Sequence, residues 1–249
     1  MNFKSIAIVD DSIGGVNLLN KLKISNNENY IYFADMKNFP LGLWNRDLYN
    51  KVKNITNILE EMNLKCVIFT NPLISIYTDI KIPKIDGINT AIDSLKNDDL
   101  LVLASRRMVK SGIFKSIKRC DCIDASMLIN LLHDGDNNPY IIKTLIKEYI
   151  GEYKGNVLLF DSNLSVFKNY FSEIKGINVY TLEDFIIKDF YDFLSDDIKN
   201  IKFNRSKIKY LVSDYRIAFY LSCEAFYEGK YSAVKKIKKD FFNAIFQKK

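Results

Sequence analysis

Short runs of apolar residues alternate along the chain with segments whose apolar positions recur every three to four residues. Ser5–Val9 is such a run, and the glycine-containing loop Asp10–Gly15 separates it from the amphipathic segment Val16–Leu22. Continuous short runs predict buried strands, and the helical period predicts helices that cover them. We therefore expect a strand, a tight turn and a helix at the start of the chain. The same succession recurs in Tyr30–Phe33, Arg46–Met62, Cys66–Phe69, Ile74–Thr78 and Ile80–Ile85.

A second series of strands and helices follows the polar break Asn97–Asp99. Its strands are predicted at Leu100–Ala104, Cys122–Ala125, Val157–Phe160 and Asn178–Thr181. Its helices are predicted at Val109–Lys118, Met127–Leu132, Pro139–Tyr153 and Leu164–Ile174, with a later helix at Glu183–Leu194. Strands that alternate with helices indicate βαβ units. The predicted fold class is α/β, with two similar lobes, each a parallel sheet covered by helices, and a site in the cleft between them.

The loops that follow the predicted strands are the places to look for chemistry, because open parallel sheets bind ligands outside the carboxyl ends of their strands. These loops are Asp10–Gly15, Asp35–Gly42, Thr70–Ser75, Ser105–Gly112 and Asp161–Ser165. Asp10 is either a carboxylate that faces the cleft or a turn or N-cap residue. Gly14 and Gly15 belong neither to GxGxxG nor to GxxxxGK[ST], so they indicate close packing rather than nucleotide binding.

Composition narrows the choice of partner. The chain has 249 residues and a formal net charge of +6, and its apolar runs are far shorter than the roughly 20 residues that span a bilayer. We expect a cytoplasmic protein without membrane contact. The basic residues are mixed with acidic ones and no nucleic-acid-binding motif is found, so a nucleic-acid partner is not expected.

The cysteines do not form a recognisable metal or disulfide pattern. Cys120 and Cys122 could together bind a metal, but no second pair accompanies them and His133 is the only histidine. We expect no metal, and we interpret the pair as two thiols at the edge of a strand.

Three motifs at matching intervals carry a resemblance to a known family. Asp10–Gly15 is similar to the motif FDSGVGG, and Tyr32–Asp35 followed by Pro40–Gly42 is similar to YFGD…PYG. Ala104–Ser105 and Lys110–Phe114 are similar to AT…KSGxY at the start of the second series. With these motifs in order over most of its length, the chain resembles the glutamate racemases of the aspartate/glutamate racemase family.

The resemblance implies racemisation without a cofactor. In that family one thiolate removes the α-proton of the amino acid and a thiol on the opposite face returns a proton, and each lobe contributes one cysteine. The family's C-terminal segment returns to the first lobe, which implies a first lobe of residues 1–96 and 182–249 and a second lobe of residues 97–181. A small acidic amino acid as ligand and a homodimer are further expectations from the resemblance.

The residues that would carry this chemistry are changed. Thr70 stands at the first cysteine position, Asp161 at the second, and Asn163 at the position of the histidine that assists it. A threonine hydroxyl is a far poorer base than a thiol. The other departures are Asp11 for a serine, Leu41 for a tyrosine, Pro72 for a threonine and His133 for a glutamate.

The resemblance, carried over position by position, gives the candidate site. Its catalytic-equivalent residues are Asp10, Thr70, Asp161 and His133, and its candidate substrate-binding residues are Asp11, Pro40, Leu41, Gly42, Asn71, Pro72, Ser162 and Asn163. Asp161 is alternatively a helix N-cap, and His133 a partly buried histidine at a helix end. If the two faced each other across one pocket, they would form a proton-transfer pair.

Three functional hypotheses remain open at this stage. The first is a family member inactive as a two-thiol racemase that keeps the cleft for binding a small acidic amino acid or for a structural role. The second is an enzyme with altered acid and base residues that uses Asp10, Asp161 or His133. The third is a genuine glutamate racemase that supplies D-glutamate for peptidoglycan, against which the substitutions at Thr70 and Asp161 argue.

Overall fold

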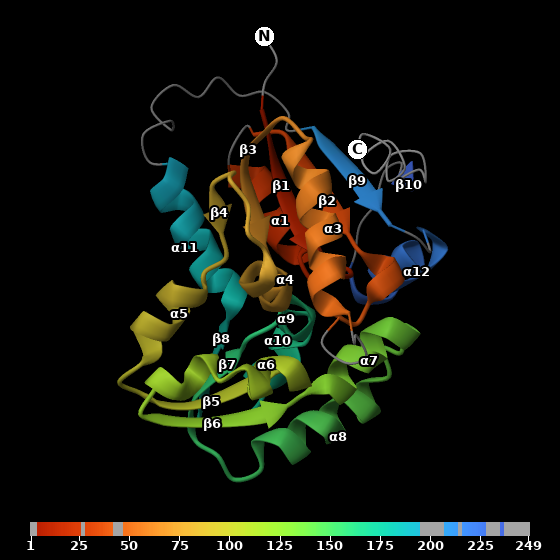
Figure 1. The fold of residues 1–249 in the computed structure, drawn as a ribbon. Helices are drawn as coiled ribbons and strands as arrows, with labels where there is room; N and C mark the ends of the chain where they lie inside the picture. Colours follow the sequence, from red (N-terminus) through yellow and green to blue (C-terminus); the bar gives the residue numbers. More distant parts are fainter. Residues whose placement is uncertain are drawn as a thin grey trace.

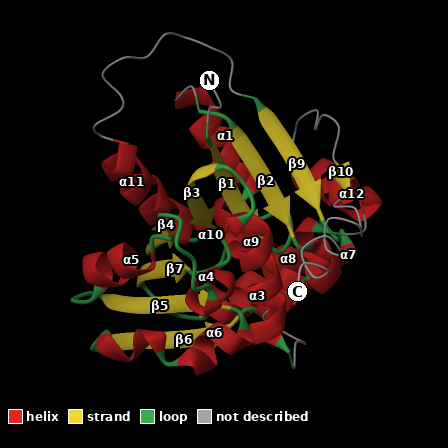
Figure 2. Cartoon of the chain, turned by 45° about the horizontal axis from the view of Figure 1, so that its top comes forward, coloured by secondary structure: helices red, strands yellow, loops and turns green. Residues whose placement is uncertain are grey.

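The computed structural model describes residues 4–25, 28–41, 47–194, 207–213, 216–227 and 235–236. Within these residues two fully parallel sheets are present, and each is covered by helices (Figures 1 and 2). The α/β prediction of two helix-covered parallel sheets is therefore confirmed. Among the residues described, none of the helices combines the length and the apolar character that a membrane crossing requires.

The first sheet has the strand order β10-β9-β2-β1-β3-β4. Its strands are β1 (Ser5–Asp10), β2 (Tyr30–Ala34), β3 (Leu64–Phe69), β4 (Lys84–Ile85), β9 (Ile208–Val212) and β10 (Lys235–Lys236). The central strand β1 is buried from Ile6 to Asp10, as expected for a strand covered on both faces. We call this sheet and the helices that cover it the first lobe.

The second sheet has the order β6-β5-β7-β8. Its strands are β5 (Asp99–Ala104), β6 (Arg119–Asp124), β7 (Gly155–Leu159) and β8 (Ile177–Thr181). We call this sheet and its helices the second lobe, and Figure 1 shows it below the first.

The helices follow the strands in both series. They are α1 (Val16–Ser25), α3 (Leu48–Glu60), α4 (Pro72–Tyr77), α5 (Ile88–Leu95), α6 (Arg106–Ser111), α7 (Ser126–Asp134), α8 (Pro139–Ile150), α9 (Ser162–Ser165), α10 (Lys168–Ser172), α11 (Leu182–Leu194) and α12 (Arg216–Phe226), with 3-10 turns η1 (Met36–Asn38) and η2 (Ile113–Ser116). Helix α3 shows the expected pattern, because Val52, Ile55 and Leu59 recur at helical spacing and are buried.

Several predicted bounds are wrong, for physical reasons that the structure makes plain. The helix predicted at Val109–Lys118 is α6, which ends at Gly112 in a left-handed conformation (φ 77°) before η2 begins. The strand predicted at Ile80–Ile85 is shorter in the structure and consists only of β4. It begins directly after Pro83, because proline has no N–H to donate to a neighbouring strand. The helix predicted at Leu164–Ile174 is divided into α9 and α10.

Strand β9 lies far along the chain from its neighbour in the sheet. It pairs in parallel with β2, from Tyr30 opposite Ile208 to Ala34 opposite Val212. A segment after the second lobe thus completes the sheet of the first. The predicted lobe boundaries at residues 96–97 and 181–182 stay predictions.

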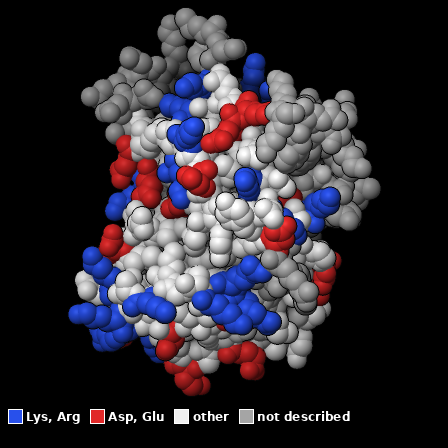
Figure 3. Space-filling view, viewed as in Figure 1, with Lys and Arg blue, Asp and Glu red and all other residues white. Residues whose placement is uncertain are grey.

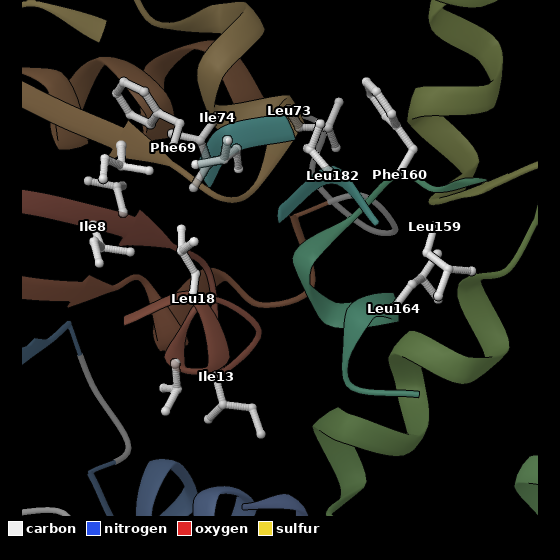
Figure 4. Close-up of a cluster of buried hydrophobic side chains, with 14 of the residues drawn as sticks. Ile8, Ile13, Leu18, Phe69, Leu73, Ile74, Leu159, Phe160, Leu164 and Leu182 are labelled. Atoms are coloured by element: carbon white, nitrogen blue, oxygen red, sulfur yellow. The ribbon is translucent and has the colours of Figure 1, made fainter. Parts of the chain in front are cut away.

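Apolar side chains from both lobes form one buried cluster. Figure 4 shows Ile8 and Phe69 on strands of the first sheet, together with Leu159, Phe160 and Leu164 from the end of β7 and from α9. All five are fully buried. The lobes are therefore packed against each other through apolar contacts as well as through the polar contacts described next.

Charged side chains are distributed unevenly over the face drawn in Figure 3. Lysine and arginine gather around α6, the helix that contains Arg106, Arg107 and Lys110, whereas acidic and basic residues mix on the first lobe. Arg106 is paired with Asp124, with 2.7 Å between Nε and Oδ2. Part of this basic charge is therefore compensated within the second lobe.

Candidate functional site

Asp10, at the carboxyl end of β1, organises the loop that follows it. Its Oδ1 accepts hydrogen bonds from the backbone N–H groups of Asp11 (2.7 Å) and Ser12 (3.2 Å). Its Oδ2 accepts from the backbone N–H of Gly15 (2.7 Å) and from the Thr70 hydroxyl (2.6 Å). Four donors thus fill the acceptor positions of one fully buried carboxylate, and they fix it as a structural anchor of the loop.

Thr70 follows β3 and is fully buried beside Asp10. Its hydroxyl oxygen lies 2.6 Å from Asp10 Oδ2 and 3.1 Å from the carbonyl oxygen of Val9, so its single proton is engaged within the fold. A Cβ on Gly15 would lie 2.6 Å from Thr70 Oγ1, which explains why only glycine fits there. The hydroxyl at this strand end is therefore held by the first lobe and is not free to act as a base.

Asp161 follows β7 in the second lobe and caps helix α9. Its Oδ1 accepts the backbone N–H of Asn163 at 3.0 Å, as the N-cap alternative anticipated. Burial raises the pKa of the Asp161 carboxyl from 3.8 to about 7, the bond from Asn163 lowers it, and the charge of Asp10 raises it further. The carboxyl therefore gains or loses its proton near neutral pH.

Asn163 joins the two lobes directly. Its side-chain amide donates to Asp11 Oδ1 at 3.0 Å, and its amide oxygen accepts from the Ser12 hydroxyl. We call these two contacts the interlobe bridge. Backbone packing accompanies it, because a Cβ on Gly14 would lie 2.6 Å from the backbone nitrogen of Asn163. At this point the lobes are in van der Waals contact and are connected by hydrogen bonds.

Asp11 lies on the first-lobe side of the interlobe bridge. Its Oδ2 accepts the backbone N–H of Leu41 at 3.0 Å, so both of its oxygens have donors. Burial, the nearby charges of Asp10 and Asp161 and a side-chain hydrogen bond with Asp10 raise the pKa of Asp11 well above its ordinary value. In the part of the chain that the structure describes, no ion pair includes Asp10, Asp11 or Asp161, which we call the carboxyl cluster.

Most of the other predicted substrate-binding residues have structural roles. Asn71 caps α4 by accepting the backbone N–H groups of Leu73 (3.0 Å) and Ile74 (3.3 Å), and Pro72 occupies the first turn of that helix. Pro40 is buried, and its peptide bond with Phe39 is cis. Leu41 is fully buried, and Gly42 lies outside the described residues.

Ser162 is the candidate whose hydroxyl has no hydrogen-bond partner among the described residues. Its Oγ is buried. It lies against Gly14, where an added Cβ would approach it to 2.7 Å. A buried hydroxyl without a partner is uncommon, because its desolvation is then not compensated.

The structure does not bring His133 into the carboxyl cluster. Its side chain is 54% exposed near the end of α7, and its Nδ1 lies 2.9 Å from Asp134 Oδ1. Its ring stacks on Phe39, with 5.7 Å between the ring centroids. No described contact joins His133 to Asp161, and the position of His133 in the last turn of α7, with its ring against Phe39, agrees with the interpretation as a partly buried histidine at a helix end.

Two residues of the site were missed by sequence reasoning. Ser12 was not among the candidate site residues, yet its hydroxyl forms half of the interlobe bridge. The Tyr32 hydroxyl donates to the carbonyl oxygen of Ser12 at 2.9 Å from the neighbouring strand. The only signal for either was their presence in the two motifs that carry the resemblance.

No described thiol hydrogen-bonds with Asp10, Thr70 or Asp161. Cys66 lies early on β3, opposite Ile6, and burial raises its pKa to about 12. Burial also raises the pKa of Cys223 in α12. Among the described residues, no group of three or more histidine, cysteine or acidic side chains is arranged to hold a metal ion.

The chain matches no protein-family model. Over 240 residues it is 25% identical to a glutamate racemase from Thermoanaerobacter sp., which covers 86% of this chain and 89% of that protein. A shorter match to glutamate racemase 3 from Caldanaerobacter subterraneus is 26% identical over 124 residues and covers 47% of this chain and 46% of that protein.

Solved structures agree with these relatives over nearly the whole chain. Glutamate racemase from Thermus thermophilus, in complex with β-chloro-D-alanine, has a TM-score of 0.84 and 15% identity and covers 96% of this chain and 98% of its own. Glutamate racemase from Francisella tularensis, in complex with D-glutamate, has a TM-score of 0.80 and 17% identity and covers 96% and 99%. The chain therefore has glutamate racemases among its homologues and shares their two-lobed α/β fold.

Proposed function

We propose that this protein is a glutamate-racemase-like protein that binds a small acidic amino acid between its lobes and does not racemise it by the two-thiol mechanism. The observation that carries the proposal is the hydrogen bond from Thr70 to Asp10. At the position where the resemblance expects a thiolate, the chain has a hydroxyl whose proton is donated to a buried carboxylate. Such a group neither removes an α-proton nor returns one at a useful rate.

The raised pKa values of Asp11 and Asp161, one in each lobe, explain how an acidic ligand could be tolerated beside three carboxyl groups. Burial raises the pKa of Asp161 to about 7 and that of Asp11 well above its ordinary value. Protonated carboxyl groups donate hydrogen bonds to carboxylates, whereas ionised ones repel them. We therefore expect binding to be stronger below neutral pH and to weaken as the pH rises through about 7.

The relatives support the choice of ligand class. The racemase from Francisella tularensis was solved with D-glutamate, and this chain shares its fold. Asn163 hydrogen-bonds with Asp11 and Ser12 across the lobes, so a ligand that binds there must first displace the interlobe bridge. A neutral amide is easier to displace than an ion pair, because its hydrogen bonds are individually weak.

Binding is tested by the thermal stability of the full chain with L- and D-glutamate and L- and D-aspartate at pH 6 and pH 8. A ligand that binds the native state raises the apparent stability. We expect a rise at pH 6 that shrinks at pH 8. Equal rises at both values, or none with any of the four amino acids, would contradict the proposed binding.

Catalysis is tested separately by solvent deuterium exchange at the α-carbon of glutamate, followed by NMR. We expect no exchange above that of a sample without protein, even at concentrations where the ligand binds. Exchange at a rate typical of racemases would contradict the non-racemising part of the proposal and leave the binding part intact.

A second candidate, a racemase with altered acid and base residues that supplies D-glutamate for peptidoglycan, is favoured by one observation. Asp161, with a pKa of about 7, is suited to exchange protons near neutral pH. This candidate predicts α-deuterium exchange that Asp161→Asn abolishes. The same measurement therefore separates the two candidates.

A further inference from the structure

Two thiols lie side by side on the outer strand of the second lobe. Cys120 and Cys122 are two residues apart on β6, so their side chains leave the same face of the strand, and their sulfur atoms are 3.8 Å apart. Both are half-buried, and neither is part of a disulfide. Both side chains keep partial exposure, so solvent reaches the pair.

The two sulfur atoms are within hydrogen-bonding distance of each other, and either thiol can be the donor. The hydrogen bond between them lowers the pKa of Cys122 and raises that of Cys120. Burial of both thiols and the charge of Asp121 oppose the ionisation of Cys122. Two sulfur atoms held at this distance can act together as ligands once both thiols have lost their protons.

The surroundings of the pair define what it can hold. Leu100 and Val102 of β5 lie opposite Cys120 and Cys122 in the sheet and are buried, so an apolar wall covers one side of the sulfur atoms. Asp124, two residues beyond Cys122, is engaged by Arg106 and Ser126. The described part of the chain therefore supplies two ligands and no third.

We propose that Cys120 and Cys122 form a two-thiolate site on β6 that binds one soft divalent cation of the zinc class, with solvent in the remaining coordination positions. Tetrahedral zinc bound at about 2.3 Å by two thiolates separates their sulfur atoms by about 3.8 Å, which matches the spacing in the structure. Thiolates select soft ions over magnesium and calcium. Each thiol that coordinates releases its proton to solvent, so uptake of the ion sets free up to two protons, and its affinity falls as the pH is lowered.

The experiment uses the full-length, reduced protein and Cd(II), whose bonds to sulfur give a charge-transfer absorption in the ultraviolet. We expect one ion per chain. We also expect Cys120→Ser and Cys122→Ser each to weaken binding by more than about tenfold, because a chelating pair becomes a single ligand. Mg(II) in excess should not compete.

Cys66→Ala and Cys223→Ala are the matched controls, because both thiols are buried and lie outside the pair. They should keep the affinity of the parent protein, and circular dichroism should show that every variant is folded. The proposal is overturned if the double variant Cys120→Ser, Cys122→Ser still binds one Cd(II) with the parent affinity. Loss of binding in either control variant while it remains folded would equally overturn it.

Discussion

The two lobes contribute unequally to the place where they meet. On the first-lobe side, Asp10 accepts four hydrogen bonds and Thr70 donates one of them, so this carboxylate is fully satisfied within its own lobe. On the second-lobe side, the Asp161 carboxyl accepts the backbone N–H of Asn163 and has a pKa of about 7, and the Ser162 hydroxyl has no partner among the described residues. Asp10 and Thr70 are thus fixed by their own lobe, whereas Asp161 and Ser162 have fewer partners to hold them.

The largest loss of stability should come from a substitution at Gly14, where the two lobes are in close contact. Gly14→Ala places a Cβ 2.6 Å from the backbone of both Ser162 and Asn163, so the lobes must separate. We expect the free energy of unfolding, measured in urea, to fall by about 3 kcal/mol. Gly135→Ala is the control, because that Cβ meets nothing within 4 Å and only the left-handed backbone costs about 1 kcal/mol. Equal losses would show that the interlobe contact is loose.

Removing the hydrogen bond between Thr70 and Asp10 should lower the free energy of unfolding somewhat less. Thr70→Val keeps the shape of the side chain and removes one donor to the buried Asp10 carboxylate. We expect a loss of about 2 kcal/mol in the free energy of unfolding. Thr56→Val removes a buried hydroxyl that is bound only to the carbonyl of Val52 in its own helix and should cost less. A larger loss for Thr56→Val would contradict the role given to Asp10.

Removing the interlobe bridge should have a smaller effect on stability. Asn163→Ala leaves Asp11 and Ser12 without their partner in the second lobe, and we expect a loss of about 1 kcal/mol. The exposed Asn178, which bonds Asn156, is the control, and Asn178→Ala should change stability by less than about 0.5 kcal/mol. If the proposed function holds, Asn163→Ala should also bind glutamate more tightly than the parent, because the ligand no longer displaces the amide.

The pH dependence of stability should reveal a titrating group in the second lobe. The pKa of Asp161 is raised in the folded state from 3.8 to about 7, so the native chain keeps a proton that the unfolded chain has lost. Stability should therefore fall as the pH rises from 3.8 towards about 7 and level off above, with a slope below about 1.4 kcal/mol per pH unit. Asp161→Asn should flatten this slope. A slope unchanged in the variant would assign the titration to another group.

The fold could be predicted from the sequence because its signals are local. Runs such as Ile6–Val9 fill a strand that is buried on both faces, and the spacing of Val52, Ile55 and Leu59 follows a helix. Element ends were harder, because α6 stops where Gly112 turns left-handed, a property of the backbone that a helical pattern does not contain.

The positions of site residues could be predicted only for those that directly follow a strand. The positions of Asp10 and Thr70 follow from the ends of β1 and β3, and the structure brings the two together. The bond between Asn163 and Asp11 joins residues of different lobes, and no local pattern encodes that distance. The stacking of His133 on Phe39 illustrates the same limit, because the two residues are far apart in the sequence.

The pairing of β9 with β2 bears on how the chain acquires this structure during synthesis. When β2 emerges from the ribosome, its partner β1 has been made but its other partner, β9, has not, and the whole second lobe is translated in between. The unpaired edge of β2 is therefore open to wrong partners until the late segment arrives, a known route to misassembly. We expect the second lobe to be the earlier folding unit, and the sheet of the first lobe to be completed only after β9 has been made.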